Sequence, residues 1–341
     1  MNIATMTYHW MPNYGAVLQT YALQQFLKEN KHETEVLNYV PKRILYRSYL
    51  GYIKRKQFDI LKRISQTKKF IKNEIKVSNQ EYHNHFELEQ SITYYNAFIC
   101  GSDQIWCEWF IKNAEKKDCF SYYLDFVGDK SKKIAYAVSF GSVPISNDSV
   151  KNIMRYGQEF DWIGVREKEG QQLLKKIGIK SKLVCDPVFL ISREKFNELA
   201  DKCTIKEQKA FVFILKNNKQ LAVKLIKEVE KKDSYCTKTK SVYEWLAVIK
   251  KSSIVVTDSF HCMAFCLIFH TPFWVVPTGN HGFDDRIQTL LEIVNLGTRK
   301  CSYIRNDLEN TDIDWSEVDD LLKKYTDKSR YYLNEVLNYD N

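Results

Sequence analysis

The chain has 341 residues, of which 44% are apolar and 27% are charged, and its formal net charge is +9. This composition excludes an intrinsically disordered protein, and the length favours two domains over one. No apolar run reaches the roughly 20 residues that span a bilayer, and residues 1–6 lack the pattern of a signal peptide, so we expect a cytoplasmic protein.

The excess positive charge lies in one segment. Residues 42–76 hold 12 Lys or Arg and 2 acidic residues, a net charge of +10 against +9 for the whole chain. The rest is nearly neutral, so nucleic-acid binding is not expected. Apolar residues recur there at helical spacing, which predicts a basic amphipathic helix or helix pair. A solvated outer face and docking on an anionic membrane or lipid diphosphate both remain open.

Strands and helices alternate through the first half of the chain, which predicts a doubly wound parallel sheet. We assign residues 1–185 to a Rossmann-like domain with an insert at 42–76, and place a hinge at Asp186-Pro187, because proline keeps the preceding residue extended. The predicted strands are 2–7, 36–40, 97–100, 133–139, 162–165 and 183–185.

The second half repeats this alternation, so residues 186–314 are predicted to form a smaller Rossmann-like domain. Residues 315–341 have helical periodicity and are predicted to cap the second domain or to cross back onto the first. The predicted elements are strands at 211–215, 235–237, 254–257 and 273–276 and helices at 218–231, 241–251 and 259–270.

Nine cysteines are an odd number without paired spacing, which predicts reduced thiols. Cys262 and Cys266 are four residues apart, but no second pair stands at the spacing of a zinc site. We therefore expect no metal.

Ligands of open α/β sheets bind beyond the carboxyl ends of the strands, so the residues after each predicted strand are candidates. Asn13, Tyr14 and Gly15 open a helix whose N-terminus attracts anions, although an ordinary turn explains them equally well. Ser102, Asp103 and Gln104 follow the strand at 97–100. Their side chains suit a ligand rich in hydroxyls, unless Ser102 or Asp103 caps a helix.

Two further segments suit an anionic ligand. Arg166 follows the strand at 162–165, and its planar fork matches carboxylate or phosphate oxygens. The alternative is an ion pair with Glu167 or Glu169. Arg286, at the start of a later helix, is a second candidate clamp.

His261 is the strongest candidate for chemistry. The strand at 254–257 ends in small polar residues, and His261 then lies in the first turn of an apolar helix. A helix N-terminus disfavours the cationic imidazole unless an anion is bound beside it, so the setting suits acid or base chemistry on an anionic ligand. The alternative is a hydrogen-bonded core histidine.

Taken together, these segments resemble the polysaccharide pyruvyl transferase family. The matching segments are Asn13–Gln19, Gly101–Trp106, Ala135–Gly141, Val165–Glu167, Cys185–Pro187, Thr257–His261 and Asp285–Arg286. The resemblance implies a fold like that of two-domain GT-B glycosyltransferases, with the site in an interdomain cleft. It also implies that phosphoenolpyruvate donates its pyruvyl group to a sugar as a ketal.

The resemblance implies roles for individual residues. His261 and Arg166 would be catalytic, and the donor would be bound by Arg166, Ser259, Phe260 and Arg286. The acceptor would be bound by Asn13, Tyr14, Gly15, Ser102, Asp103 and Gln104. Related proteins carry Arg where this chain has Ser259, and commonly Gly where it has Cys262.

No cofactor is expected besides phosphoenolpyruvate as co-substrate. The expected acceptor is a sugar of a surface polysaccharide or its lipid-linked oligosaccharide precursor, with peripheral contact to an anionic membrane as an option. Two other functions remain open: a GT-B-like glycosyltransferase that uses a nucleotide sugar, and a non-catalytic scaffold of a polysaccharide assembly locus.

Overall fold

The computed structural model of the protein describes residues 1–42, 58–114, 120–141, 145–215, 235–236, 239–278, 281–300 and 312–338. The chain divides into two compact units, Met1–Ile191 with Thr326–Asn341 (unit 1) and Ser192–Tyr325 (unit 2). The sequence placed the boundary at residue 186 and treated 315–341 as a separate tail. Instead, Asp186 is hydrogen-bonded into unit 1, and the tail forms helix α14 (Trp315–Asn338), whose residues are shared between the units.

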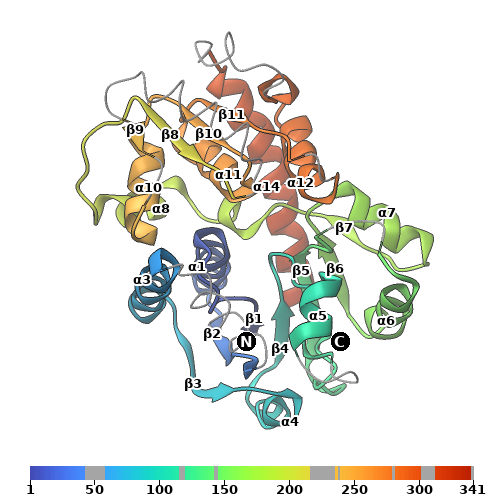
Figure 1. Ribbon diagram of the computed structural model, residues 1–341. Coiled ribbons are helices and arrows are strands. Elements are labelled where there is room, and N and C mark those ends of the chain that lie inside the picture. The colour runs from blue at the N-terminus through green and yellow to red at the C-terminus, as the bar shows by residue number, and fades with distance from the viewer. Residues whose placement is uncertain are drawn as a thin grey trace. The chain divides into compact units, whose positions relative to one another are not determined.

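Unit 1 is built on a parallel sheet of seven strands in the order β3-β2-β1-β4-β5-β6-β7 (Figure 1). Six of these strands were predicted to within a few residues. The prediction missed β3, because its sequence VSNQEY has no apolar run and half of its residues are exposed. The strands are β1 (Asn2–Met6), β2 (Glu33–Tyr39), β3 (Val77–Tyr82), β4 (Ala97–Cys100), β5 (Lys132–Val138), β6 (Trp162–Val165) and β7 (Lys182–Leu183).

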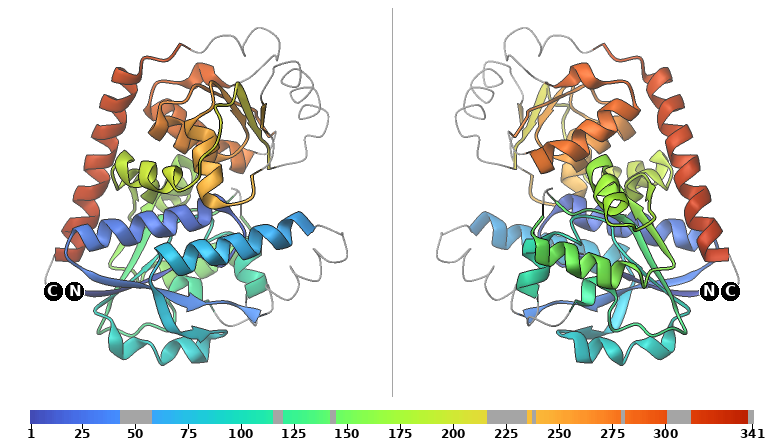
Figure 2. Two further views of the ribbon diagram at one scale, coloured as in Figure 1. Left: turned by 90° about the vertical axis from the view of Figure 1, so that its left-hand side faces the viewer. Right: turned by 90° about the vertical axis from the view of Figure 1, so that its right-hand side faces the viewer.

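The helices of unit 1 cover both faces of its sheet. The strand order reverses at β1, so right-handed crossovers place α1 and α3 on one face and α5, α6 and α7 on the other. Figure 2 shows α1 and α3 side by side. The helices are α1 (Tyr14–Glu29), α3 (Phe58–Glu74), α4 (His85–Glu89), α5 (Glu108–Ala114), α6 (Asn147–Gly157) and α7 (Lys168–Lys176), with short turns η1 (Ile92–Tyr94), η2 (Ser121–Tyr123) and η3 (Pro187–Phe189).

Helix α3 confirms the helical prediction for the later part of the basic segment. Residues 43–57 of that segment lie outside the described residues. The central strands are buried on both faces, and all four residues of β4 are buried. Strands covered on both faces are continuous apolar runs, which is why the sequence located them well.

Unit 2 contains a smaller parallel sheet in the order β11-β10-β8-β9 (Figure 1). All four strands were predicted. The predicted helix at 218–231 lies outside the described residues. The strands are β8 (Ala210–Phe213), β9 (Tyr235–Cys236), β10 (Val255–Thr257) and β11 (Phe273–Val275), and the helices are α8 (Arg193–Asp201), α10 (Val242–Lys250), α11 (Phe260–Phe269), α12 (His281–Ile293) and the turn η4 (Gly297–Arg299).

Six cysteines whose side chains the structure describes are free thiols: Cys100, Cys107, Cys185, Cys203, Cys262 and Cys266. Burial raises the pKa of Cys185 to about 11, so this thiol stays protonated near neutral pH. Among the described residues, no helix combines the length and the apolar character needed to span a bilayer.

Candidate functional site

The strand order of unit 1 reverses between β1 and β4, so the segments that follow these two strands diverge and leave room for a ligand. Thr7 follows β1, and Ser102 follows β4. The Thr7 hydroxyl donates to the backbone oxygen of Ser102 at 3.2 Å, which ties the two strand ends together. The Gln19 amide of α1 donates to Thr7 Oγ1 at 2.9 Å and accepts from the Ser102 amide at 3.0 Å.

Ser102 is therefore a structural residue of this edge. It is 0% exposed, and its hydroxyl lies 3.0 Å from the Ala137 oxygen and 3.2 Å from Asp186 Oδ2. It caps no helix, and its hydroxyl has no access to an acceptor sugar. Gln104, two residues further on, is partly exposed.

Arg166 lies at the end of β6, as predicted; it pairs with Glu167, which the sequence offered, and more closely with two carboxylates that the sequence did not offer. Its Nη1 donates to Asp186 Oδ2 at 2.7 Å, and its Nη2 donates to Asp103 Oδ1 at 3.0 Å. Glu167 is more distant, with 3.9 Å between Arg166 Nε and Glu167 Oε2. The fork thus bridges two carboxylates from different strand ends.

This arrangement does not fit the prediction that Arg166 binds an anionic donor. The Arg166 side chain is 1% exposed and Asp186 is 0% exposed. Burial by itself lowers the pKa of Arg166, but the charges of Asp103, Asp186 and Glu167 raise it above its ordinary value. The guanidinium stays charged, and the carboxylates already around it neutralise that charge.

Asp103 has the most solvent contact in this network, because its side chain is 14% exposed against 6% for Glu167. Its backbone has φ of 76°, and Ala137 beside it has φ of 52°. Left-handed conformations of non-glycine residues are strained and are concentrated at functional sites. Asp103 is thus the member of this network best placed to contact a ligand hydroxyl.

Gly101 is required by this geometry. Its φ is 120°, and a Cβ atom at this position would lie 2.1 Å from the backbone oxygen of Tyr136. Any side chain here would push β4 away from β5 and displace Asp103.

The start of α1 is an ordinary capped helix N-terminus. The Asn13 side chain accepts from the amides of Gly15 and Ala16, at 2.9 and 3.4 Å. Tyr14 and Gly15 are buried, and the Arg63 guanidinium lies 5.2 Å from the centre of the Tyr14 ring. The structure thus favours the alternative that the sequence left open, an N-terminal turn, over direct acceptor contacts.

A cavity of about 590 Å³ lies at the carboxyl edge of the unit 1 sheet, beside α3, and the sequence did not predict it. Its walls include Trp10, Met11 and Ile71, and its polar groups include Asn38 and Glu81. A volume of this order accommodates a small-molecule ligand. The segment 8–12 directly follows β1, so its position after a predicted strand was the signal that could have found it.

His9 lines this cavity and was not singled out from the sequence. It is buried, and its ring nitrogens lie 3.3 Å from the Thr7 oxygen and 3.3 Å from Asn38 Oδ1. Burial lowers the pKa of His9, so the imidazole is neutral at physiological pH. The ring is held between these two polar groups, so His9 shapes the wall of the cavity.

The order of strands in unit 2 reverses between β8 and β10, and the predicted motif lies there. The Thr257 hydroxyl donates to the Phe213 oxygen at 2.7 Å, and Asp258 Oδ1 accepts from the Leu215 amide at 2.7 Å. These two bonds hold the ends of the strands together just before α11 begins.

Ser259 caps α11, because its hydroxyl accepts from the Cys262 amide at 3.4 Å. His261 is the second residue of the helix and is 7% exposed, and its ring centre lies 5.3 Å from that of Phe260. Arg286 is buried in α12 of the same unit. Unit 2 therefore contains His261 and three of the four predicted donor-binding residues, whereas Arg166 belongs to unit 1.

The comparisons with known proteins agree with this architecture. A structure of the UDP-GlcNAc 2-epimerase from Methanocaldococcus jannaschii has a TM-score of 0.53 at 9% identity, over 100% of this chain and 100% of that one. A Listeria monocytogenes protein assigned as a UDP-N-acetylglucosamine 2-epimerase has a TM-score of 0.50 at 11% identity, over 97% and 90% of the two chains. At these identities the likeness concerns the fold alone, and it confirms the expected class of two Rossmann-like α/β units of the GT-B-like kind.

No curated protein matches the sequence significantly. The family model for polysaccharide pyruvyl transferase, by contrast, matches residues 13–280, which include both strand-order reversals and the start of α11. The chain therefore belongs to the polysaccharide pyruvyl transferase family.

Proposed function

We propose that the protein transfers the pyruvyl group of phosphoenolpyruvate to two hydroxyls of one sugar. The observation that carries this proposal is the position of His261, in the first turn of α11 and at the strand-order reversal of unit 2, in a chain of this family. In the reaction the methylene carbon gains a proton and two hydroxyl oxygens bond to the central carbon. Phosphate leaves with the second hydroxyl proton, which leaves a cyclic ketal.

Phosphoenolpyruvate carries a phosphate and a carboxylate, so its site must supply positive potential. The N-terminus of α11 supplies part of it, and Arg286 is the candidate clamp within the same unit. His261, in the first turn of α11, is the group assigned to donate a proton to the methylene carbon. Ser259 and Phe260 position this first turn.

We assign the acceptor to the carboxyl edge of the sheet in unit 1. Asp103 is placed to accept a hydrogen bond from an acceptor hydroxyl, and Arg166 holds Asp103 in position. The cavity of about 590 Å³ beside α3 would take a neighbouring sugar or the carrier of the acceptor. Its rim includes the exposed Lys68 and Lys72 of α3, which suits a lipid-linked oligosaccharide and contact with an anionic membrane.

The test is incubation with phosphoenolpyruvate and a panel of nitrophenyl and lipid-linked sugars. Released phosphate and the mass gained by the sugar are both measured. We expect His261→Ala to lower kcat by about 10²- to 10⁴-fold, the usual contribution of a general acid. His270→Asn is the matched control, because His270 ends the same helix in a left-handed conformation that asparagine tolerates. Equal non-zero rates for His261→Ala and the unaltered protein would refute the assigned role of His261, and no phosphate release by either protein would leave a non-catalytic scaffold.

A second candidate is a glycosyltransferase that uses a nucleotide sugar. It is favoured by the fold likeness to a UDP-GlcNAc 2-epimerase, a protein that acts on such a ligand. Calorimetric titration separates the two. Binding of phosphoenolpyruvate supports pyruvyl transfer, whereas binding of nucleotide sugars alone supports the glycosyltransferase.

A further inference from the structure

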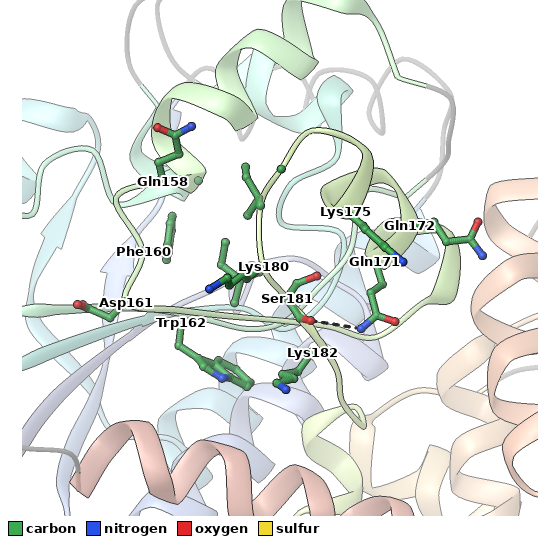
Figure 3. A pocket seen from close by; sticks show the side chains of 14 residues that line it. Gln158, Phe160, Asp161, Trp162, Gln171, Gln172, Lys175, Lys180, Ser181 and Lys182 are labelled. Atoms are coloured by element: carbon green, nitrogen blue, oxygen red, sulfur yellow. Dashed lines mark hydrogen bonds between the residues drawn. The ribbon is translucent and has the colours of Figure 1, made fainter.

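Unit 1 has a second hollow, which is lined by neither His9 nor Asp103. It has a volume of about 1070 Å³ and is formed by the end of α6, one side of α7 and the chain entering β6 and β7 (Figure 3). Residues such as Asp161 and Ser181 precede their strands, so this hollow opens at the amino edge of the sheet. The chemistry of open α/β sheets occurs at the opposite edge, so the hollow is a separate feature.

One aromatic ring lines the hollow. Phe160 is half-buried, whereas the Trp162 ring points to the other face of the strands, where it stacks on Tyr136 with ring centres 6.3 Å apart. In Figure 3, Gln158 and Phe160 lie on one side of the hollow, and Gln171 and Lys175 lie on the other. Rigid aromatic faces pack well against the apolar C–H faces of sugar rings.

Three side-chain amides supply hydrogen-bonding groups in the same hollow. Gln158 and Gln172 are exposed, and Gln171 is held in place because its Nε2 donates to the Ser181 oxygen at 3.3 Å. An amide both donates and accepts, as a sugar hydroxyl does. This combination of amides and an aromatic ring suits a saccharide.

The charge of the hollow is positive. Lys175 and Lys180 line it and are exposed, whereas the Lys182 ammonium points to the other face of the strands and lies 5.2 Å from the centre of the Tyr332 ring. The acidic residue in the lining is Asp161, whose Oδ2 accepts from the Lys133 amide at 2.7 Å. Two ammonium groups against one engaged carboxylate favour an anionic ligand.

We infer that this hollow is a second saccharide site, which binds a carboxylate-bearing stretch of polysaccharide. The inference rests on the proposed function only for where the carboxylates come from: a pyruvyl ketal leaves one carboxylate on each modified sugar, so the product of the proposed reaction is itself an acidic polysaccharide. The site would thus hold the acidic product chain at the amino edge of the sheet, while the carboxyl edge receives the next sugar.

The test uses direct binding to the full chain and does not require transfer. A hyaluronan tetrasaccharide supplies sugar and carboxylate, maltotetraose supplies sugar alone, and acetate supplies carboxylate alone. Calorimetry should show that the hyaluronan tetrasaccharide binds at least about tenfold more tightly than either partial ligand, since hydrogen bonds to charged groups are stronger than neutral ones. Equal affinity for maltotetraose would overturn the inference.

Variants locate the binding. Lys180→Ala should weaken hyaluronan binding about five- to tenfold, and Gln172→Ala should weaken it by a smaller factor. Lys176→Ala is the matched control, because Lys176 is also an exposed lysine, at the end of α7 and four residues before Lys180, but does not line the hollow. Equal losses in Lys176→Ala and Lys180→Ala would reduce the effect to general surface charge and refute the site.

The outcomes separate this inference from the proposed function. Saccharide binding of the expected pattern without phosphate release from phosphoenolpyruvate keeps the site and removes the assigned reaction. Phosphate release without saccharide binding removes the site and keeps the reaction.

Discussion

Replacing Arg166 with methionine removes a buried cation from the centre of the carboxylate network in unit 1. Asp186 would lose its closest donor, and Asp103 would lose the group that holds its carboxylate in place. Methionine has a similar length and no charge, so the change tests the charge more than the packing. The structure predicts a large loss of stability from this substitution.

The magnitude follows from burial. Asp186 is 0% exposed, so removing Arg166 leaves an uncompensated buried carboxylate, and breaking such a pair typically costs about 3–5 kcal/mol. Asp103 is 14% exposed and would be partly resolvated, so it adds little to this figure. Arg166→Lys keeps the charge but cannot bridge both carboxylates, and should cost about 1–3 kcal/mol.

The assay is urea unfolding combined with hydrogen exchange of peptides from β4, β5 and β6. The double variant Arg166→Met/Asp186→Leu should recover at least about 1 kcal/mol relative to the sum of the single changes, because the two groups are in contact. A free energy of unfolding for Arg166→Met within about 1 kcal/mol of the unaltered protein would refute the reasoning. If KM for phosphoenolpyruvate also rose, the donor-binding role predicted from the sequence would be restored.

Three further predictions concern single residues. Gly101→Ala should lower the free energy of unfolding by about 3 kcal/mol or more, because a Cβ would collide with the Tyr136 oxygen at a strained φ; Gly128→Ala, with open space around it, is the control in the same urea titration. His9→Gln should flatten the loss of stability between pH 7.5 and 5.5. The pKa of His9 is lowered in the folded protein, so the unfolded chain binds a proton first as the pH falls below about 6.5. The free energy of unfolding then falls by up to about 1.4 kcal/mol per pH unit. Equal slopes of this free energy against pH in both proteins would contradict the prediction. Ser259→Ala should destabilise unit 2 by about 1 kcal/mol in urea titrations through loss of the α11 cap, and Ser259→Thr, which keeps the hydroxyl, should lose less.

Much of the fold was accessible from the sequence because it depends on local patterns. Strands buried on both faces, such as β4 and β6, are short runs of apolar residues between polar ones, and their order along the chain with helices between them indicates parallel sheets. The same logic located the ends of the strands, and so it found Asp103, Arg166 and His261. Strand β3 was not predicted, because it lies at the edge of the sheet and an edge strand needs no apolar run.

The sequence did not predict the closest partners of these residues. Asp186 follows Arg166 by 20 positions and Asp103 precedes it by 63, so no helical or strand period relates them. Their meeting depends on the order of β4, β5 and β6 and on the path of the chain after β7, which brings Asp186 back under the edge of the sheet.

The sequence by itself determined which segments form strands and helices and which side chains stand at the ends of strands, because hydrophobic periodicity and turn chemistry act between near neighbours. Only the tertiary structure decided that Arg166 is enclosed by carboxylates, that Asn13 is occupied as a helix cap and that a cavity opens beside His9. Burial and charge pairing depend on all the groups that pack around an atom, and distant parts of the chain supply most of them.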